Sequence, residues 1–66
     1  MENNVIKLMR DMGVVLEACE IEAEKFADGN KSAGTRLRKY MQTVKEQAQS
    51  VRKEVQEQKN SGFMLA

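Results

Sequence analysis

The residues of this sequence whose types and spacing best suit a chemical task are cations. Five basic residues recur at intervals of seven in the second half of the chain, namely Lys31, Arg38, Lys45, Arg52 and Lys59. Since seven residues make two turns of an α-helix, these side chains are expected to form a ladder along one helix edge. Such an edge suits a phosphate backbone. It also suits a coiled coil, where Lys and Arg cover the core and pair with Glu of a neighbouring helix.

A second concentration of charge lies at the start of the same predicted helix. It comprises Lys31, Arg36, Arg38, Lys39 and Lys45, and no acidic residue occurs between Gly29 and Lys45. The first turn of a helix leaves backbone N–H groups without helical partners and carries the positive end of the helix dipole, so acidic residues are usual there. Basic residues in their place favour an external anion. Ser32 and Thr35 add hydroxyl donors that suit phosphate.

The composition excludes most enzymatic machinery. The chain has no His and one Cys, so it cannot form an internal disulfide, the usual structural zinc site, a Ser/His/Asp triad or a Cys/His pair. Glu17, Glu20 and Glu24 have helical spacing, which predicts a solvated acidic face rather than a metal site. Cys19 is expected to be a small buried apolar residue. We therefore predict no enzyme, with no catalytic residues, no metal and no cofactor.

The charge is divided unevenly along the chain. The formal total is +1, but residues 1–28 hold three basic and seven acidic residues, a net −4, whereas residues 29–66 hold eight basic and three acidic residues, a net +5. This asymmetry favours an anionic partner for the basic half. The alternative is that the two halves neutralise each other when the chain folds. No stretch approaches the roughly 20 apolar residues of a membrane span, so no membrane association is expected.

The apolar pattern predicts an all-α antiparallel helical hairpin in one domain, residues 1–60. We expect helices over 3–28 and 31–59, a turn at 29–30 and an apolar tail over 61–66. Gly29 suits the left-handed residue after a helix end, and Asn30 suits an N-cap. The predicted seam repeats in steps of three and four: Val5, Met9, Met12, Leu16, Cys19, Ala23 and Phe26 in the first helix, and Leu37, Met41, Val44, Ala48, Val51 and Val55 in the second.

The first helix is too apolar to be covered by one partner helix. A second copy of the hairpin would cover the remainder, as a homodimeric four-helix bundle or a higher homo-oligomer, and would compensate for the small core of so short a chain. A different partner protein, or a monomer with an apolar face, remains the alternative. The residues expected at the interface between copies are Ile6, Leu8, Met12, Val15 and Ile21.

The run from Gly29 to Glu54 resembles a known family, the small linker-histone-like DNA-binding proteins of bacteria and viruses, of the chlamydial histone-like type. The resemblance covers about 26 residues. Its pattern is a Gly-Asn-Lys turn, a pair of small residues, an Arg-x-Arg and a helix that ends in Arg-Lys. The matching residues are Gly29, Asn30, Lys31, Ala33, Gly34, Arg36, Arg38, Arg52 and Lys53. The chlamydial type carries a Lys- and Ala-rich tail, whereas Phe63 to Ala66 here are apolar.

The resemblance implies a histone-like protein that binds double-stranded DNA without sequence specificity, in a salt-sensitive manner, and organises or compacts it. We then expect an intracellular location with the nucleoid, chromatin or virus-packaged DNA. The predicted DNA-contacting residues are Lys31, Ser32, Thr35, Arg36, Arg38, Lys39, Lys45, Arg52 and Lys53. The alternative is a coiled-coil adaptor that pairs with a protein partner and binds no DNA.

Overall fold

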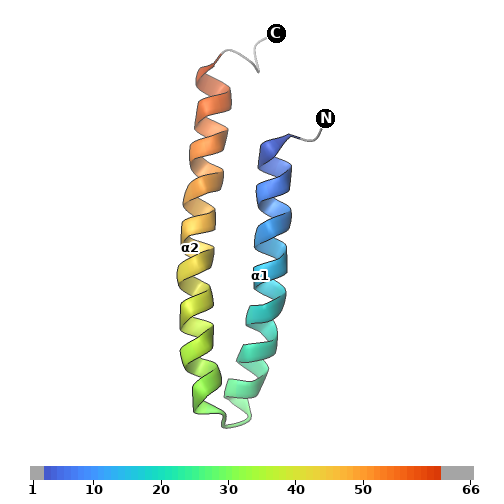
Figure 1. Cartoon of the computed structure of the whole chain (residues 1–66), viewed down its shortest axis with the longest axis vertical. Helices are drawn as coiled ribbons and strands as arrows, with labels where there is room; N and C mark the ends of the chain where they lie inside the picture. The colour runs from blue at the N-terminus through green and yellow to red at the C-terminus, as the bar shows by residue number, and fades with distance from the viewer. Residues whose placement is uncertain (1–2, 62–66) are drawn as a thin grey trace.

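The chain folds as a hairpin of two long antiparallel helices. The computed structural model describes residues 3–61 and contains α1 (Asn4–Ala27) and α2 (Lys31–Asn60), side by side in a molecule 53 Å long (Figure 1). The predicted all-α hairpin is confirmed. The sequence placed the helices at 3–28 and 31–59, so the bounds differ by at most one residue at each end. Of the predicted apolar tail, residues 62–66 lie outside the described part of the chain.

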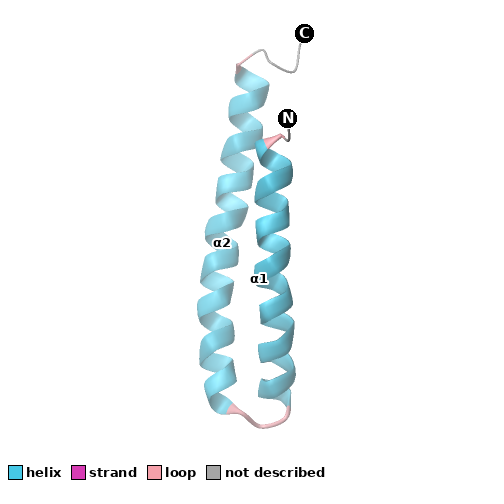
Figure 2. Ribbon diagram, turned by 45° about the vertical axis from the view of Figure 1, so that its right-hand side comes forward, coloured by secondary structure: helices cyan, strands magenta, loops and turns pink. Residues whose placement is uncertain are grey.

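The connection between the helices is short because Gly29 ends α1 and Asn30, the next residue, caps the start of α2. Gly29 has φ of 104°, the left-handed conformation that glycine adopts without steric cost. Its N–H donates to the carbonyl of Phe26 at 3.0 Å, and the N–H of Asn30 donates to the carbonyl of Lys25 at 3.0 Å. These two bonds make a Schellman motif. The Asn30 side chain then caps α2 by accepting from the Ala33 N–H at 3.1 Å. The roles predicted for Gly29 and Asn30 are confirmed, and Figure 2 shows this tight loop.

The contact between the helices follows a heptad pattern. Its rows, called a and d below, are half-buried or buried: Val5, Leu8, Met12, Val15, Cys19 and Glu22 in α1, and Ala33, Leu37, Tyr40, Val44, Gln47, Val51, Glu54 and Gln58 in α2. Only Cys19, Glu22 and Ala33 among the described residues are buried outright. The interior of the hairpin is therefore thin.

This contact corrects the predicted seam. Met9, Leu16 and Phe26 were expected inside it, yet their exposed fractions are 53%, 47% and 53%, and Met41 and Val55 in α2 are 43% and 38% exposed. The apolar arc is broader than one contact, and α2 packs against one side of it.

The interface residues predicted for a second copy are divided by the fold. Leu8, Met12 and Val15 are half-buried in the hairpin contact, whereas Ile6 and Ile21 are exposed.

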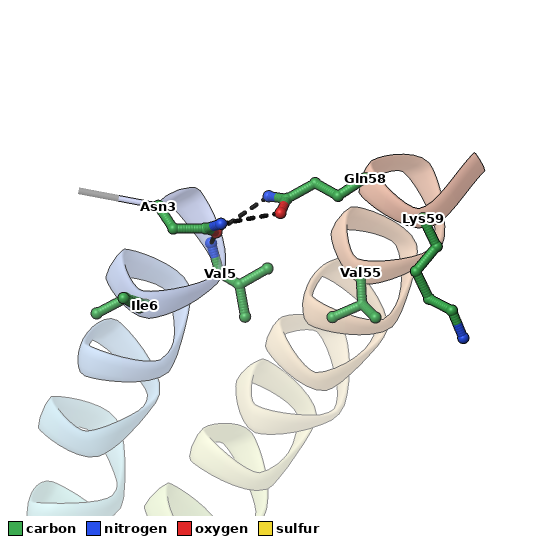
Figure 3. Close-up of a pocket in the computed structure, with 6 residues that line it drawn as sticks. All are labelled: Asn3, Val5, Ile6, Val55, Gln58 and Lys59. Carbon is green, nitrogen blue, oxygen red and sulfur yellow. Dashed lines mark hydrogen bonds between the residues drawn. The ribbon is translucent and has the colours of Figure 1, made fainter. Parts of the chain in front are cut away.

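Polar contacts also join the two helices. Asn4 donates to the Glu54 carboxylate, and Asn3 and Gln58 exchange two hydrogen bonds, at 2.9 and 3.0 Å, across the open end of the hairpin (Figure 3). Neither described helix is apolar enough over its length to cross a membrane.

Candidate nucleic-acid interface

The surface of α2 that points away from α1 carries most of the predicted contact residues. Counting the seam residues Leu37 and Tyr40 as a and d, the basic ladder occupies every b position, with the c and f positions beside it on the same outer side. All five ladder side chains are exposed. Lys39 and Lys53 occupy c positions and are exposed as well. We call these b, c and f positions together the outer face of α2.

The cations of this outer face keep their charge available to solvent. There are seven of them: Lys31, Arg38, Lys39, Lys45, Arg52, Lys53 and Lys59. Within residues 3–61 none of the seven forms an ion pair. Among the described residues, neither Glu17 nor Glu20 on α1 forms an ion pair with Arg38. Within the described residues the basic ladder therefore adds no ion pair across the seam. Its exposed charges are suited to an external anion.

Two similar groups of side chains lie on this outer face, and the second also reaches Glu57, at the g position beside it. A shallow depression is lined by Thr35, Arg38, Lys39 and Gln42, and a second by Gln49, Arg52, Lys53, Gln56 and Glu57. The pattern Arg-Lys-x-x-Gln occurs twice in α2, first as Arg38, Lys39 and Gln42 and then as Arg52, Lys53 and Gln56. The two occurrences are fourteen residues apart, which is about 21 Å along the helix axis. Sequence reasoning missed this Arg-Lys-x-x-Gln repeat, although its fourteen-residue spacing is a detectable signal. The amides of Gln42, Gln49 and Gln56 add uncharged donors between the cations.

Arg36 has a different environment from the other predicted contacts. It points toward α1, where its Nε donates to Glu22 Oε2 at 2.5 Å and its Nη2 donates to Glu22 Oε1 at 3.3 Å. Glu22 is 7% exposed, and Lys25 Nζ lies 4.0 Å from its carboxylate. The hydrogen bonds from Arg36 hold the pKa of Glu22 below its ordinary value, against the opposing effect of burial. They also raise the pKa of Arg36. The sequence offered no sign that Glu22 would be the partner.

The start of α2 is occupied partly by the chain itself. Asn30 accepts from the Ala33 N–H through both its side chain and its carbonyl, at 3.1 and 3.2 Å. One backbone donor that an anion at this helix end would use thus has an internal partner. Ser32 and Thr35 are exposed. The fold brings Thr35 together with Arg38 and Lys39, and it separates Arg36 from them.

The fold and this surface define a small all-α protein, an antiparallel helical hairpin with an exposed cationic face on one helix. Among the described residues no group of three or more Cys, Asp or Glu side chains could hold a metal ion. Comparison with known families gives the particular relationship: residues 6–61 match the family described as histone H1-like protein Hc1, and the chain belongs to that family of histone-like DNA-binding proteins. The resemblance drawn from residues 29–54 is confirmed. No curated protein and no solved structure matches the chain.

Proposed function

We propose that this protein binds double-stranded DNA without sequence specificity through the outer face of α2. The observation that supports the proposal is the set of seven exposed cations on that face that have no ion-pair partner in the described chain. A helix face that carries seven cations against one acid, Glu46, gains affinity from phosphates by releasing their counterions, irrespective of the base sequence. In this proposal Lys31, Lys39, Lys45, Lys53, Arg38 and Arg52 contact phosphates, and Lys59 joins them.

The residue types on this face favour contacts with the DNA backbone. The described part of the outer face carries no aromatic side chain, and Tyr40 is half-buried in the seam. Bases therefore have no stacking platform, which argues against single-strand binding. Ser32, Thr35 and the glutamine amides fit phosphate and sugar oxygens, contacts that position a protein without reading sequence.

Arg36 takes a positioning role in this proposal. Its charge is matched by Glu22 at hydrogen-bond distance, so it orients α2 against α1 rather than meeting a phosphate. The protein would act with the nucleoid, chromatin or packaged DNA, as a homodimer or higher homo-oligomer that organises the duplex.

A salt series on a random duplex tests the proposal. If all seven cations neutralise phosphates, the logarithm of the binding constant falls with the logarithm of salt concentration at a slope of about −6. Arg38→Gln with Lys39→Gln should weaken binding at low salt and make that slope shallower by about 2.

The matched control for this pair is Lys7→Gln with Lys25→Gln, which removes the same charge from α1. It should leave the slope within about 0.5 of the wild-type value. Equal losses from the two pairs would show that total charge, and not the outer face of α2, determines binding, and would overturn the assignment.

A further inference from the structure

The open end of the hairpin, where α1 begins and α2 ends, carries a groove between the two helices. Its volume is about 290 Å³, and its walls are Asn3, Val5, Ile6, Val55, Gln58 and Lys59 (Figure 3). Three of these side chains are aliphatic, and Ile6 and Val55 are 49% and 38% exposed. An apolar cavity of about 150 Å³ holds a benzene molecule. The groove therefore has room for an aromatic ring and a second apolar side chain.

The sequence that follows α2 supplies apolar side chains next to this groove. Residues 62–66 read Gly-Phe-Met-Leu-Ala and lie outside the described part of the chain. Val55 precedes Ser61 by six residues, which is about 9 Å along the helix axis. An extended chain advances about 3.3 Å per residue. Residues 63–65 therefore reach the groove if the chain turns back along α2.

The end of α2 has the geometry of a helix end after which the chain reverses. Ser61 is its C-cap, with φ of −76° and ψ of −6°, and its N–H donates to the carbonyl four residues earlier at 3.0 Å. Asp28, the C-cap of α1, has φ of −83° and ψ of 4° and donates in the same way at 3.1 Å. Gly29 then reverses the chain with its positive φ. Gly62 follows Ser61 just as Gly29 follows Asp28.

We propose that residues 63–65 fold back into this groove and close the open end of the hairpin. A glycine directly after a C-cap favours the left-handed turn, and the residue after the glycine then lies over the third residue before the cap. In α2 these two residues are Phe63 and Gln58, and Gln58 lines the groove. The Phe63 ring thus enters the groove beside Val55.

The side chains of the returning segment have different environments. Successive side chains of an extended segment point to opposite sides, so Leu65 follows Phe63 into the groove and Met64 points to solvent. The two buried side chains also cover the pair Asn3 and Gln58, whose two hydrogen bonds join the helices at this end. A hydrogen bond shielded from water is electrostatically stronger. The segment therefore acts as a clasp that holds the first turn of α1 against α2.

Nuclear Overhauser spectra of the full chain test the clasp directly. Ring protons of Phe63 should give cross-peaks to methyl groups of Ile6 and Val55, and the methyl group of Met64 should give none to either. In a mixture of isotope-labelled and unlabelled chains, filtered spectra should show that the cross-peaks arise within one chain. Absence of the cross-peaks would overturn the proposal. Cross-peaks that arise only between chains would overturn it too, because the groove would then hold the segment of another copy.

Hydrogen exchange of backbone amides measures what the clasp does. The N–H groups of Ile6 and Lys7 both donate to the carbonyl of Asn3, at 3.0 and 3.3 Å, so their exchange reports opening of the first turn of α1. Phe63→Ser should accelerate exchange at both amides about fivefold, whereas the matched control Met64→Ser should change it by less than about twofold. Equal effects of the two variants, or no effect of Phe63→Ser, would overturn the clasp.

A comparison of double variants tests whether this groove is the binding site. In a Val55→Ser background, Phe63→Ser should no longer accelerate exchange at Ile6. In a Met41→Ser background it should keep its full effect, because Met41 is similarly exposed, at 43%, but lies twenty residues, about 30 Å, from Ser61. An undiminished effect in the Val55→Ser background would overturn the assignment. The cross-peak experiment needs no substitution and stands whatever the fold of Val55→Ser.

Discussion

The Glu22 carboxylate on α1 accepts two hydrogen bonds from the Arg36 guanidinium on α2, and Glu22 is the one charged side chain of the described residues that is buried. The bidentate geometry matches a planar guanidinium to a planar carboxylate, which fixes the relative rotation of the two helices as well as their distance. This rotation brings Glu22 into the d row and moves Leu16 out of the contact.

We expect Arg36→Gln to destabilise the hairpin more than Lys25→Gln does. Arg36→Gln leaves a buried carboxylate without its main donor, whereas Lys25 is an exposed neighbour at 4.0 Å. The urea midpoint at fixed protein concentration measures the difference. Glu22→Gln with Arg36→Gln should recover part of the loss, because the buried charge is then gone. A double variant no more stable than Arg36→Gln would show that the two residues act independently.

Stability should fall on acidification in part through Glu22. Its pKa is lower in the folded chain than in the unfolded chain, mainly because it accepts hydrogen bonds from Arg36. The carboxylate therefore contributes fully above the ordinary glutamate pKa of about 4.3, and the contribution is lost as pH falls through the lowered folded pKa. Urea midpoints of the wild type and Glu22→Gln, measured from pH 7 to pH 2, should differ most at pH 7 and converge at low pH. A constant difference would contradict this assignment.

The two glycines inside the helices should respond differently to alanine. A Cβ at Gly13 would meet nothing within 4 Å, so Gly13→Ala should stabilise the chain by about 1 kcal/mol. A Cβ at Gly34 would lie 2.7 Å from two ring carbons of Phe26, so that ring must move. Gly34→Ala should therefore gain clearly less than Gly13→Ala or lose stability, as measured by urea unfolding. Equal gains would show that the Phe26 ring shifts without cost.

Replacement of Gln47 by an apolar residue should stabilise the hairpin. It occupies a half-buried d position, and its side-chain oxygen has no hydrogen-bond partner among the described residues. Gln47→Leu should raise the free energy of unfolding by about 1 kcal/mol, because the cost of the unpartnered oxygen is removed and the seam gains apolar contact. Gln49→Leu is the exposed control and should change it by less than about 0.5 kcal/mol. A gain at Gln49 equal to that at Gln47 would attribute the effect to helix propensity.

The helices and the turn could be predicted from the sequence because their signals are local. Gly29 and Asn30 act on their immediate neighbours, and the absence of proline together with the heptad spacing favours two long helices. The basic edge was predictable for the same reason, since a seven-residue interval places side chains on one side of any helix. The family resemblance was carried by the same stretch.

The rotation of the helices about their own axes was decided only by the tertiary structure. The apolar arc of each helix is wide enough to seat a partner on either side of its a row, so a seam through Met9 and Leu16 fits the pattern as well as one through Leu8 and Val15. Contacts between residues far apart in the sequence select between them: Glu22 with Arg36, Asn4 with Glu54 and Asn3 with Gln58. These pairings set Arg36 apart from the cationic outer face and leave Leu16 and Met41 exposed. Hydrogen-bond geometry discriminates between rotations that hydrophobic burial alone treats as nearly equal.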